Sequence, residues 1–316
     1  MKVSIIGAGA VGVGICNYLL TMGECQEVVL VDLNKERTRG EQLDFSHTSA
    51  LTFAKNTKIT SGEYEDTRDS DVVVITAGAQ IKVGQDRLEI GHINAKITVE
   101  IARQLERYTP NAIIIVVTNP CDILTHFIIR NTNFPAHRVI SAGCVVDTAR
   151  MMKIIADKVK IDPKNVFGYV MGEHGANSFI PWSIVNIAGQ KIDDFCQQND
   201  VPMLDPQELL KATKAIGLEV FSLKLNTNHA IAASVFRIIR AISINEYSVL
   251  PVGTMLNDEY GLNDVVVNVP MVISSKGVER ILKYKLPADE LEQLHQCAAA
   301  LRQVVEQVAE STGLKC

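Results

Sequence analysis

The sequence has no long hydrophobic run. No stretch approaches the ~18 consecutive apolar residues that a membrane-spanning helix requires, so we expect no membrane partner. The first seven residues combine a Lys with several apolar residues but contain no extended apolar region and no cleavage motif. This pattern is typical of a β-strand and not of a signal peptide, and it predicts a cytoplasmic protein.

The sequence also has no excess of positive charge. Its 31 Lys and Arg residues are outnumbered by 36 Asp and Glu residues, which gives a formal net charge of −5 at pH 7. A phosphate backbone repels such a chain on average, so we do not expect a nucleic-acid partner. A local basic pocket for a small anion is still compatible with this composition.

Paired cysteine motifs are absent. The number of cysteines is odd and none of them are spaced as CxxC, which argues against a disulfide scaffold and against a zinc knuckle. We therefore predict reduced thiols and no metal site. The seven cysteines are Cys16, Cys25, Cys121, Cys144, Cys196, Cys297 and Cys316.

The chain contains no low-complexity linker and no internal repeat, and 47% of its 316 residues are hydrophobic, enough for a large core in two domains or in one large α/β unit. In the first half, short apolar runs alternate with helix-length segments. This alternation predicts an α/β fold with a doubly wound parallel sheet of the Rossmann type. The predicted strands are 3–6, 28–31, 72–76, 113–117 and 138–141, and the predicted helices are 11–22, 35–47, 86–107 and 121–131.

The second half has a different pattern. It combines long helical periodicity with shorter apolar runs, and we place the boundary so that the first domain covers 1–142 and an α+β domain covers 143–316. The mostly polar segment 191–201 is expected to be a loop. Predicted helices are 207–223, 228–245 and 287–312, predicted strands are 167–171, 184–187 and 265–272, and a turn signal follows at 274–277.

A glycine motif follows the first predicted strand. Gly7, Gly9 and Gly12 form GxGxxG at the start of a predicted helix, and Asp32 ends the next strand about 20 residues later. The three glycines permit a tight turn, close approach of a pyrophosphate and close packing of the helix, in that order. Asp32 can accept hydrogen bonds from ribose hydroxyls and would repel a 2′-phosphate, which predicts NAD over NADP. The alternative is a glycine-rich turn in an ordinary α/β protein.

Four further segments occur in a distinctive order, namely 78–87, Thr118-Asn119-Pro120, Asp147-Thr148-Ala149-Arg150 and Gly172-Glu173-His174-Gly175. Together with 7–12 they resemble the L-lactate/malate dehydrogenase family in order and spacing over essentially the whole chain. The resemblance implies an NAD-dependent oxidoreductase that moves a hydride between nicotinamide and a small 2-oxo or 2-hydroxy acid. It also implies a homo-oligomer, either a dimer or a tetramer.

His174 is the predicted acid/base of this reaction. Oxidation of an alcohol needs a base for the hydroxyl proton, reduction needs an acid, and an imidazole with a pKa near 7 can serve as both. By the resemblance, Asp147 is the carboxylate that fixes the tautomer and balances the charge of His174. The alternatives are a buried structural histidine and, for Asp147, an N-cap of a helix over 148–158.

Further side chains complete the site that the resemblance implies. Arg150 would bind the substrate carboxylate with its guanidinium fork, and Arg87 would polarise the carbonyl from a closing loop. Asn119 would contact substrate and nicotinamide from the carboxyl edge of the sheet, and Thr227 aligns with a pocket threonine. The alternatives are a surface ion pair for Arg150 and a solvated side chain for Arg87. The implied cofactor contacts are Gly7, Ala8, Gly9, Ala10, Val11, Gly12, Asp32, Thr76, Ala77, Gly78, Asn94, Val117 and Asn119.

Two positions bear on which 2-hydroxy acid is used. Counting back from Arg87, Ile81 takes the position that discriminates substrates in the family, although a slip of one residue would place Gln80 or Lys82 there. Ile cannot pair with a second carboxylate, which disfavours malate. Ile81 and the small Gly217 resemble the L-2-hydroxyisocaproate dehydrogenases, so we predict tolerance of larger or branched side chains. Strict L-lactate specificity is the alternative.

Regulation and two competing functions complete the predictions. Met152 and Phe167 take positions where relatives carry an Arg and a His for fructose 1,6-bisphosphate, so we expect no activation by that sugar phosphate. An NAD- and metal-dependent glycosidase would pair a Cys with a His near the nicotinamide, but Cys121 has no His at a convincing spacing. A non-catalytic NAD-binding protein would leave the set of acid/base and carboxylate-binding residues unexplained.

Overall fold

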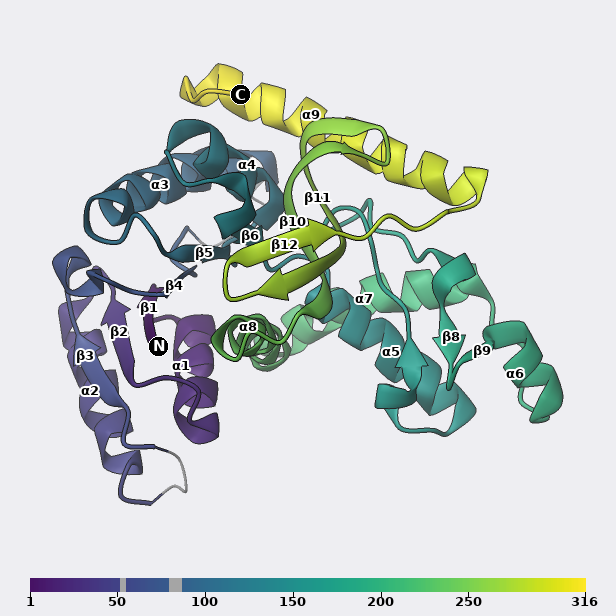
Figure 1. The fold of residues 1–316 in the computed structure, drawn as a ribbon, viewed down its shortest axis with the longest axis horizontal. Coiled ribbons are helices and arrows are strands. Elements are labelled where there is room, and N and C mark those ends of the chain that lie inside the picture. The colour runs from purple at the N-terminus through teal and green to yellow at the C-terminus, as the bar shows by residue number, and fades with distance from the viewer. Residues whose placement is uncertain (52–54, 80–86) are drawn as a thin grey trace.

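A computed structural model describes residues 1–51, 55–79 and 87–316, with residues 87–89 described as backbone only. Its main feature is one nine-stranded sheet in the order β12-β11-β10-β6-β5-β4-β1-β2-β3 (Figure 1). The strands of the first half run parallel to one another, and their order reverses between β1 and β4. These strands are β1 (Lys2–Ile6), β2 (Glu27–Val31), β3 (Lys58–Ser61), β4 (Val72–Ile75), β5 (Ile113–Val116) and β6 (Val139–Ser141).

Helices cover both faces of this sheet. The central strands are buried on both sides, as their unbroken Val and Ile runs predict. In Figure 1, α3, α4 and α9 gather on one side of the sheet, whereas α1 and α8 pack together on the other. The doubly wound parallel sheet and four helices predicted for the first half are confirmed. These helices are α1 (Ala10–Met22), α2 (Lys35–Thr48), α3 (Arg87–Tyr108) and α4 (Cys121–Asn131).

The second half continues the same sheet with antiparallel strands. β10 (Ser248–Glu259) pairs with β6 through Gly253 and Ser141, and β11 (Leu262–Ser274) and β12 (Gly277–Ile281) follow. The turn signal at 274–277 is confirmed as the link between β11 and β12. The sequence predicted only part of β11 and missed its partners, because Pro251 and Gly253 interrupt the apolar pattern of β10 and strand pairing depends on distant residues.

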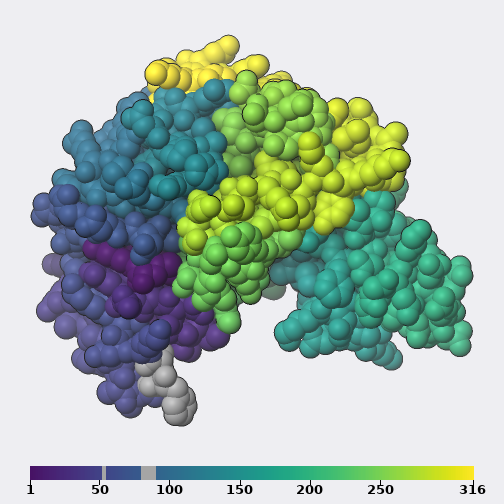
Figure 2. Space-filling model, viewed as in Figure 1, coloured from purple at the N-terminus to yellow at the C-terminus, as the bar shows by residue number. Residues whose placement is uncertain are grey.

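A smaller layer lies beside the main sheet and forms the projecting teal lobe in Figure 2. Its strands are very short: β7 (Val166–Phe167), β8 (Asn186–Ile187) and β9 (Gln190–Lys191). The strand predicted over 167–171 is wrong beyond Phe167, apart from an isolated bridge at Met171, and residues 182–184 form a 3₁₀ turn. A separate apolar cluster of this lobe buries α5 (Val145–Val159) and α7 (Pro206–Lys224) against these strands.

The loop predicted over 191–201 is also wrong, because α6 (Ile192–Gln198) occupies it. Ile192 and Cys196 stand four residues apart and are its buried positions, a short apolar face that the surrounding polar residues concealed. The remaining helices are α8 (His229–Ser243) and α9 (Ala288–Thr312), and the 3₁₀ turns are η1 (Tyr64–Thr67), η2 (Ala136–Arg138), η3 (Pro163–Asn165) and η4 (Trp182–Ile184). Over the residues that the structure describes, none of the helices is both long enough and apolar enough to cross a membrane.

Candidate active site

The glycine motif forms the turn between β1 and α1. Gly7 has a φ of +108°, and an ideal Cβ on it would lie 2.7 Å from the backbone N of Ala77. An ideal Cβ on Gly12 would lie 2.0 Å from the carbonyl O of Gly7, so any side chain there would push α1 away from the turn. Gly9 has no atom within 4 Å of an ideal Cβ. The turn therefore needs glycine at its first and third positions and is open above its second.

This turn has the features that a dinucleotide requires. Gly9 caps α1 without a side-chain hydrogen bond, so the amide groups at the helix start are left to meet a pyrophosphate. Asp32 lies just after β2, half-buried, and its carboxylate accepts hydrogen bonds from the amides of Ala8 at 2.7 Å and Asn34 at 2.9 Å. These two bonds hold Asp32 beside the turn, where a ribose would follow the pyrophosphate.

The loops after β4 and β5 lie next to the turn and are held together by Asn94. Asn94 is 1% exposed; its Oδ1 accepts from the Ala79 amide at 2.7 Å, and its Nδ2 donates to the Asn119 carbonyl at 2.8 Å. Thr76 donates to the Gly7 carbonyl at 2.9 Å. Asn94 therefore supports the loops from within, while the exposed Asn119 side chain stands at the carboxyl edge of the sheet, where ligands bind.

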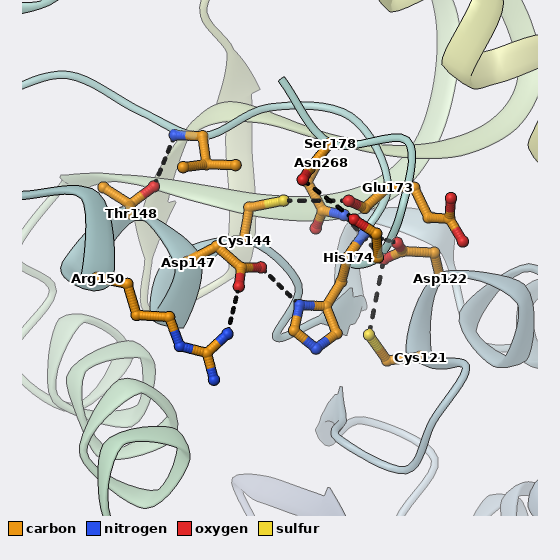
Figure 3. Close-up of polar contacts among 12 residues, drawn as sticks. Cys121, Asp122, Cys144, Asp147, Thr148, Arg150, Glu173, His174, Ser178 and Asn268 are labelled. Atoms are coloured by element: carbon orange, nitrogen blue, oxygen red, sulfur yellow. Dashed lines mark hydrogen bonds and ion pairs between the residues drawn. The ribbon is translucent and has the colours of Figure 1, made fainter. Parts of the chain in front are cut away.

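The central cluster joins His174, Asp147 and Arg150 (Figure 3). Nδ1 of His174 lies 2.6 Å from Oδ2 of Asp147, and Nη1 of Arg150 donates to Oδ1 of Asp147 at 2.7 Å. The three side chains are 22%, 11% and 19% exposed, respectively. One carboxylate thus binds both the imidazole and the guanidinium, and the ring's Nε2 edge is left for a substrate.

The helix α5 sets the spacing of Asp147 and Arg150. Because α5 begins at Val145 after a Cys144 cap, Asp147 lies within the first turn, and the alternative of an N-cap for a helix over 148–158 is wrong. Arg150 follows one turn later, so both side chains project from the same face. The alternative for Arg150 was a surface ion pair. Arg150 does form an ion pair, but with the buried carboxylate of Asp147.

The charges of the cluster stabilise one another. Burial alone would lower the pKa of His174, but the carboxylate of Asp147, with a smaller contribution from Asp122, raises it above its usual range. Burial alone would raise the pKa of Asp147, but His174 and Arg150 hold it below its usual range. An imidazolium hydrogen-bonded to a carboxylate can deliver a proton and keep its orientation.

Asp122 is a site residue that the sequence analysis missed. It stands in the first turn of α4, is 2% exposed, and accepts a hydrogen bond from the backbone amide of His174 at 2.7 Å (Figure 3). The only local signal was an acidic residue at a helix start, which helix dipoles favour in many proteins. Its partner lies 52 residues further along the chain.

Of the other predicted site residues, one lies against the cluster, and others lie apart from it or outside the described residues. Gly217 on α7 faces Arg150, since an ideal Cβ there would lie 2.9 Å from Nη1. Thr227 is half-buried in the segment between α7 and α8, and none of the hydrogen bonds among the described residues joins it to His174.

The lid positions Gln80, Ile81 and Lys82 lie outside the described residues, as does the side chain of Arg87. Ala10 is exposed and Val11 is half-buried in the first turn of α1, and Val117 is half-buried directly after β5.

Comparisons with known proteins agree with this arrangement. A family model described as the NAD-binding domain of lactate/malate dehydrogenase matches residues 1–141, and one described as the α/β C-terminal domain of the same family matches residues 145–312. The chain is 42% identical over 311 residues to an L-lactate dehydrogenase 2 of Clostridium acetobutylicum, covering 96% of each protein. It is 40% identical over 303 residues to an L-lactate dehydrogenase of Clostridium botulinum, covering 95% of each.

Solved structures give the same result. The chain superimposes with a TM-score of 0.93 on a minor L-lactate dehydrogenase from Enterococcus mundtii at 35% identity, covering 97% of this chain and 98% of that one. A lactate dehydrogenase from a deep-sea metagenome library of the Medee basin gives a TM-score of 0.93 at 31% identity, covering 98% of each. These matches support neither the glycosidase nor the non-catalytic alternative.

Proposed function

The chain belongs to the lactate/malate dehydrogenase family, and we propose that it is an NAD-dependent L-2-hydroxy-acid dehydrogenase of the L-lactate type. The observation that carries the proposal is the hydrogen-bonded chain from Arg150 through Asp147 to His174. Oxidoreductases of this family act on the CH–OH group of 2-hydroxy acids. The named relatives, which match this chain over almost its full length, support lactate and pyruvate as one substrate pair.

Each of the three hydrogen-bonded residues has a distinct role in the reduction of a 2-oxo acid. Protonated His174 donates the proton on Nε2 to the oxygen that becomes the hydroxyl, and the reverse reaction returns it. Asp147 holds Nδ1 and balances the charge of the imidazolium. Arg150 binds the substrate carboxylate by its guanidinium fork, which fixes the carbonyl relative to His174. The cofactor, when bound, would supply the hydride as NADH in this direction and accept it as NAD⁺ in the reverse direction.

The cofactor would be held by the turn after β1 and by Asp32. The amides at the start of α1 would meet the pyrophosphate above Gly9, and Asp32 would accept from the ribose. Asn119, at the edge of the sheet, would contact the nicotinamide side together with Thr76, Ala77, Gly78 and Val117. On the family resemblance alone, we also propose that Arg87 polarises the carbonyl and that Thr227 lines the substrate pocket.

We further propose that the side-chain pocket is wide. Gly217 removes a Cβ that would lie 2.9 Å from Nη1 of Arg150, so the helix α7 leaves room beside the substrate anchor. Ile81, at the predicted discriminating position, offers apolar contact worth about 0.8 kcal/mol per extra buried CH₂ of substrate and no partner for a second carboxylate. Both features favour larger 2-oxo acids of the 2-oxoisocaproate type and disfavour oxaloacetate.

The reaction is tested by His174→Ala with NADH and pyruvate. Loss of a true acid/base should lower kcat by roughly 10²- to 10⁴-fold while the Kd of NADH stays close to that of the parent. Lys153→Gln is a matched control, since Lys153 lies on α5 and pairs with Asp157 at an exposed site. A kcat of His174→Ala close to that of the parent would contradict the proposed role.

Specificity is tested by comparing kcat/KM for pyruvate, 2-oxoisocaproate and oxaloacetate in the parent and in Gly217→Ala. If Gly217 provides room, the substitution lowers kcat/KM most for 2-oxoisocaproate. An equal loss for all three acids would show that the added methyl displaces Arg150 and would contradict the pocket role. A higher kcat/KM of the parent for oxaloacetate than for the other two acids would overturn the proposed specificity.

Several remaining proposals rest on the sequence and the resemblance. We propose the division into an NAD-binding domain over 1–142 and a substrate domain over 143–316, a homo-oligomer, and a reducing cytoplasmic setting that suits the chain's free cysteines. Met152 and the exposed Phe167 cannot bind phosphate by charge, so we propose no activation by fructose 1,6-bisphosphate. A large fall in KM on adding that sugar phosphate would contradict this.

A further inference from the structure

We propose that Asp122 is a positioning residue for His174, holding the main chain of the His174 loop against the start of α4 while Asp147 holds the ring. Its effect on proton transfer rests on the proposed role of His174 as the acid/base. The contacts themselves do not depend on that role.

Both oxygens of the Asp122 carboxylate accept hydrogen bonds, and the donors come from separate parts of the chain. Oδ2 accepts from the backbone amide of His174 at 2.7 Å, and Oδ1 accepts from the Ser141 hydroxyl at 2.6 Å and from Nδ2 of Asn268 at 2.9 Å. A buried carboxylate is an acceptor at both oxygens, so it satisfies all of these donors at once. No neutral side chain of the same shape offers two acceptor oxygens.

Asn268 shows that this arrangement is closely packed. It lies on β11, is fully buried, and also donates through Nδ2 to the carbonyl of Gly172 at 2.9 Å. Its backbone exchanges two further hydrogen bonds with Gly172, both at 2.9 Å. An ideal Cβ on Gly143 would lie 1.6 Å from its Oδ1, so only glycine fits there. The His174 loop is therefore held from Asp122 and β11 together.

The position of Asp122 gives these contacts a consequence for catalysis. Asp122 lies three residues after Asn119, on the helix that leaves the cofactor edge of the sheet, whereas the His174 loop belongs to the second half of the chain. The hydrogen bond between them fixes the distance from the imidazole to the loop that would face the nicotinamide. A misplacement of about 1 Å between reacting groups can cost roughly 100-fold in rate.

Asp122 also contributes charge to the surroundings of His174. The charged groups that act on the imidazole are Asp147 and Arg150 from α5 and Asp122 from α4. Asp147 and Asp122 raise the pKa of His174, and Arg150 and burial lower it. Removing the Asp122 charge should therefore move the titration of His174 to lower pH.

Asp122→Asn distinguishes the roles of the two carboxylate oxygens, because it keeps one of them and replaces the other with an amide nitrogen. The remaining oxygen can keep Ser141 and Asn268, whereas the new amide group places a donor opposite the His174 amide, so the bond to the loop is lost. We would measure the titration of the His174 ring by NMR without substrate, together with kcat, KM for pyruvate and the Kd of NADH. We expect a lower titration midpoint, a fall in kcat of roughly 10- to 100-fold, and little change in the Kd of NADH.

Ser141→Ala is the matched control because it removes a donor from the other oxygen and leaves the bond to His174 in place. It should keep the parent's titration midpoint and lose less kcat. If Asp122→Asn does not fold, Asp122→Ser removes the same charge with a smaller side chain, and the same shift of the midpoint is expected.

Two results distinguish this proposal from the proposed function. Absence of turnover in the parent with any 2-oxo acid would overturn the function, and the titration would still report on Asp122. A midpoint unchanged in Asp122→Asn, with a kcat no lower than that of Ser141→Ala, would overturn the positioning role.

Discussion

Two buried carboxylates approach His174 from the first turns of two different helices, and they are satisfied in different ways. Asp147, on α5, binds the cations His174 and Arg150 through its two oxygens. Asp122, on α4, accepts from a backbone amide, a hydroxyl and a side-chain amide, all of them neutral. The first carboxylate is placed to respond to the protonation of the ring, and the second to hold the main chain that carries the ring.

The difference shows how one imidazole can be fixed and still titrate. The hydrogen bonds that neutral donors make to Asp122 keep their geometry when a proton leaves His174, whereas the ion pair with Asp147 changes with that proton. The backbone and the ring are therefore controlled by separate groups. Substitutions in the two regions should produce different combinations of kcat, KM and pH dependence.

The largest effect is expected for Asp147→Asn. The amide can donate to Nδ1, which favours the neutral tautomer that carries its proton on Nε2 and removes the charge that stabilises the imidazolium, so kcat should fall by roughly 10³- to 10⁴-fold. The titration of His174 should also move to lower pH, because the raised pKa depends chiefly on this carboxylate. Rate measurements across pH with NADH and pyruvate test both. A loss smaller than that of Asp122→Asn would reverse the roles assigned to the two carboxylates.

For Arg150→Gln we expect a smaller loss of activity and a shift of the His174 titration in the opposite direction. Loss of charged hydrogen bonds to the substrate carboxylate, each worth about 1.5–3 kcal/mol, should raise KM for pyruvate by roughly 10- to 100-fold or more. Because Arg150 lowers the pKa of His174, the titration should move to higher pH. Arg150→Lys, which keeps the charge but not the fork, should restore the titration and only part of the binding. A shift to lower pH in Arg150→Gln would contradict the charge balance described above.

The smallest effect concerns the stability of α4 itself. His126 is 3% exposed, neither ring nitrogen has a partner among the described residues, and burial lowers its pKa to about 4. The unfolded chain takes up this proton near pH 6.5, so stability falls as pH drops from about 6.5 to about 4, by at most about 3 kcal/mol. His126→Leu should flatten this slope in urea unfolding at pH 7 and pH 4.5.

The exposed His229 provides the control for that measurement. His229→Gln should leave the slope of stability against pH close to that of the parent. If His126→Leu keeps the parent's slope as well, the acid sensitivity of the fold arises elsewhere.

The sequence predicted the regions in which function depends on local spacing. Gly7, Gly9 and Gly12 act within one turn, and Asp147 and Arg150 lie one helical turn apart, so their relation is encoded in a few consecutive residues. The parallel strands were equally predictable, because burial on both faces requires continuous apolar side chains. His174 is predicted as the acid/base from the motif that surrounds it and from its chemistry.

The sequence could not predict contacts that depend on distant pairing. The addition of β10 to β6 joins residues more than 100 positions apart, as the pairing of Gly253 with Ser141 illustrates. The short strands and α6 of the smaller lobe were misassigned because their apolar faces span only one or two residues. Asp122 was missed for the same reason as β10, since its function lies in the partners that the fold brings to it.

By itself, the sequence determined the doubly wound sheet, the dinucleotide turn with Asp32, and the set of side chains able to perform acid/base chemistry on a 2-hydroxy acid. Apolar periodicity, glycine geometry and side-chain chemistry are local properties, and these are what a sequence states directly. Only the tertiary structure decided that His174 is held by two carboxylates, one on the ring and one on the main chain. The reason is physical: Asp122, Ser141 and Asn268 acquire their roles only when the fold brings them together and burial removes the water that would otherwise bind them.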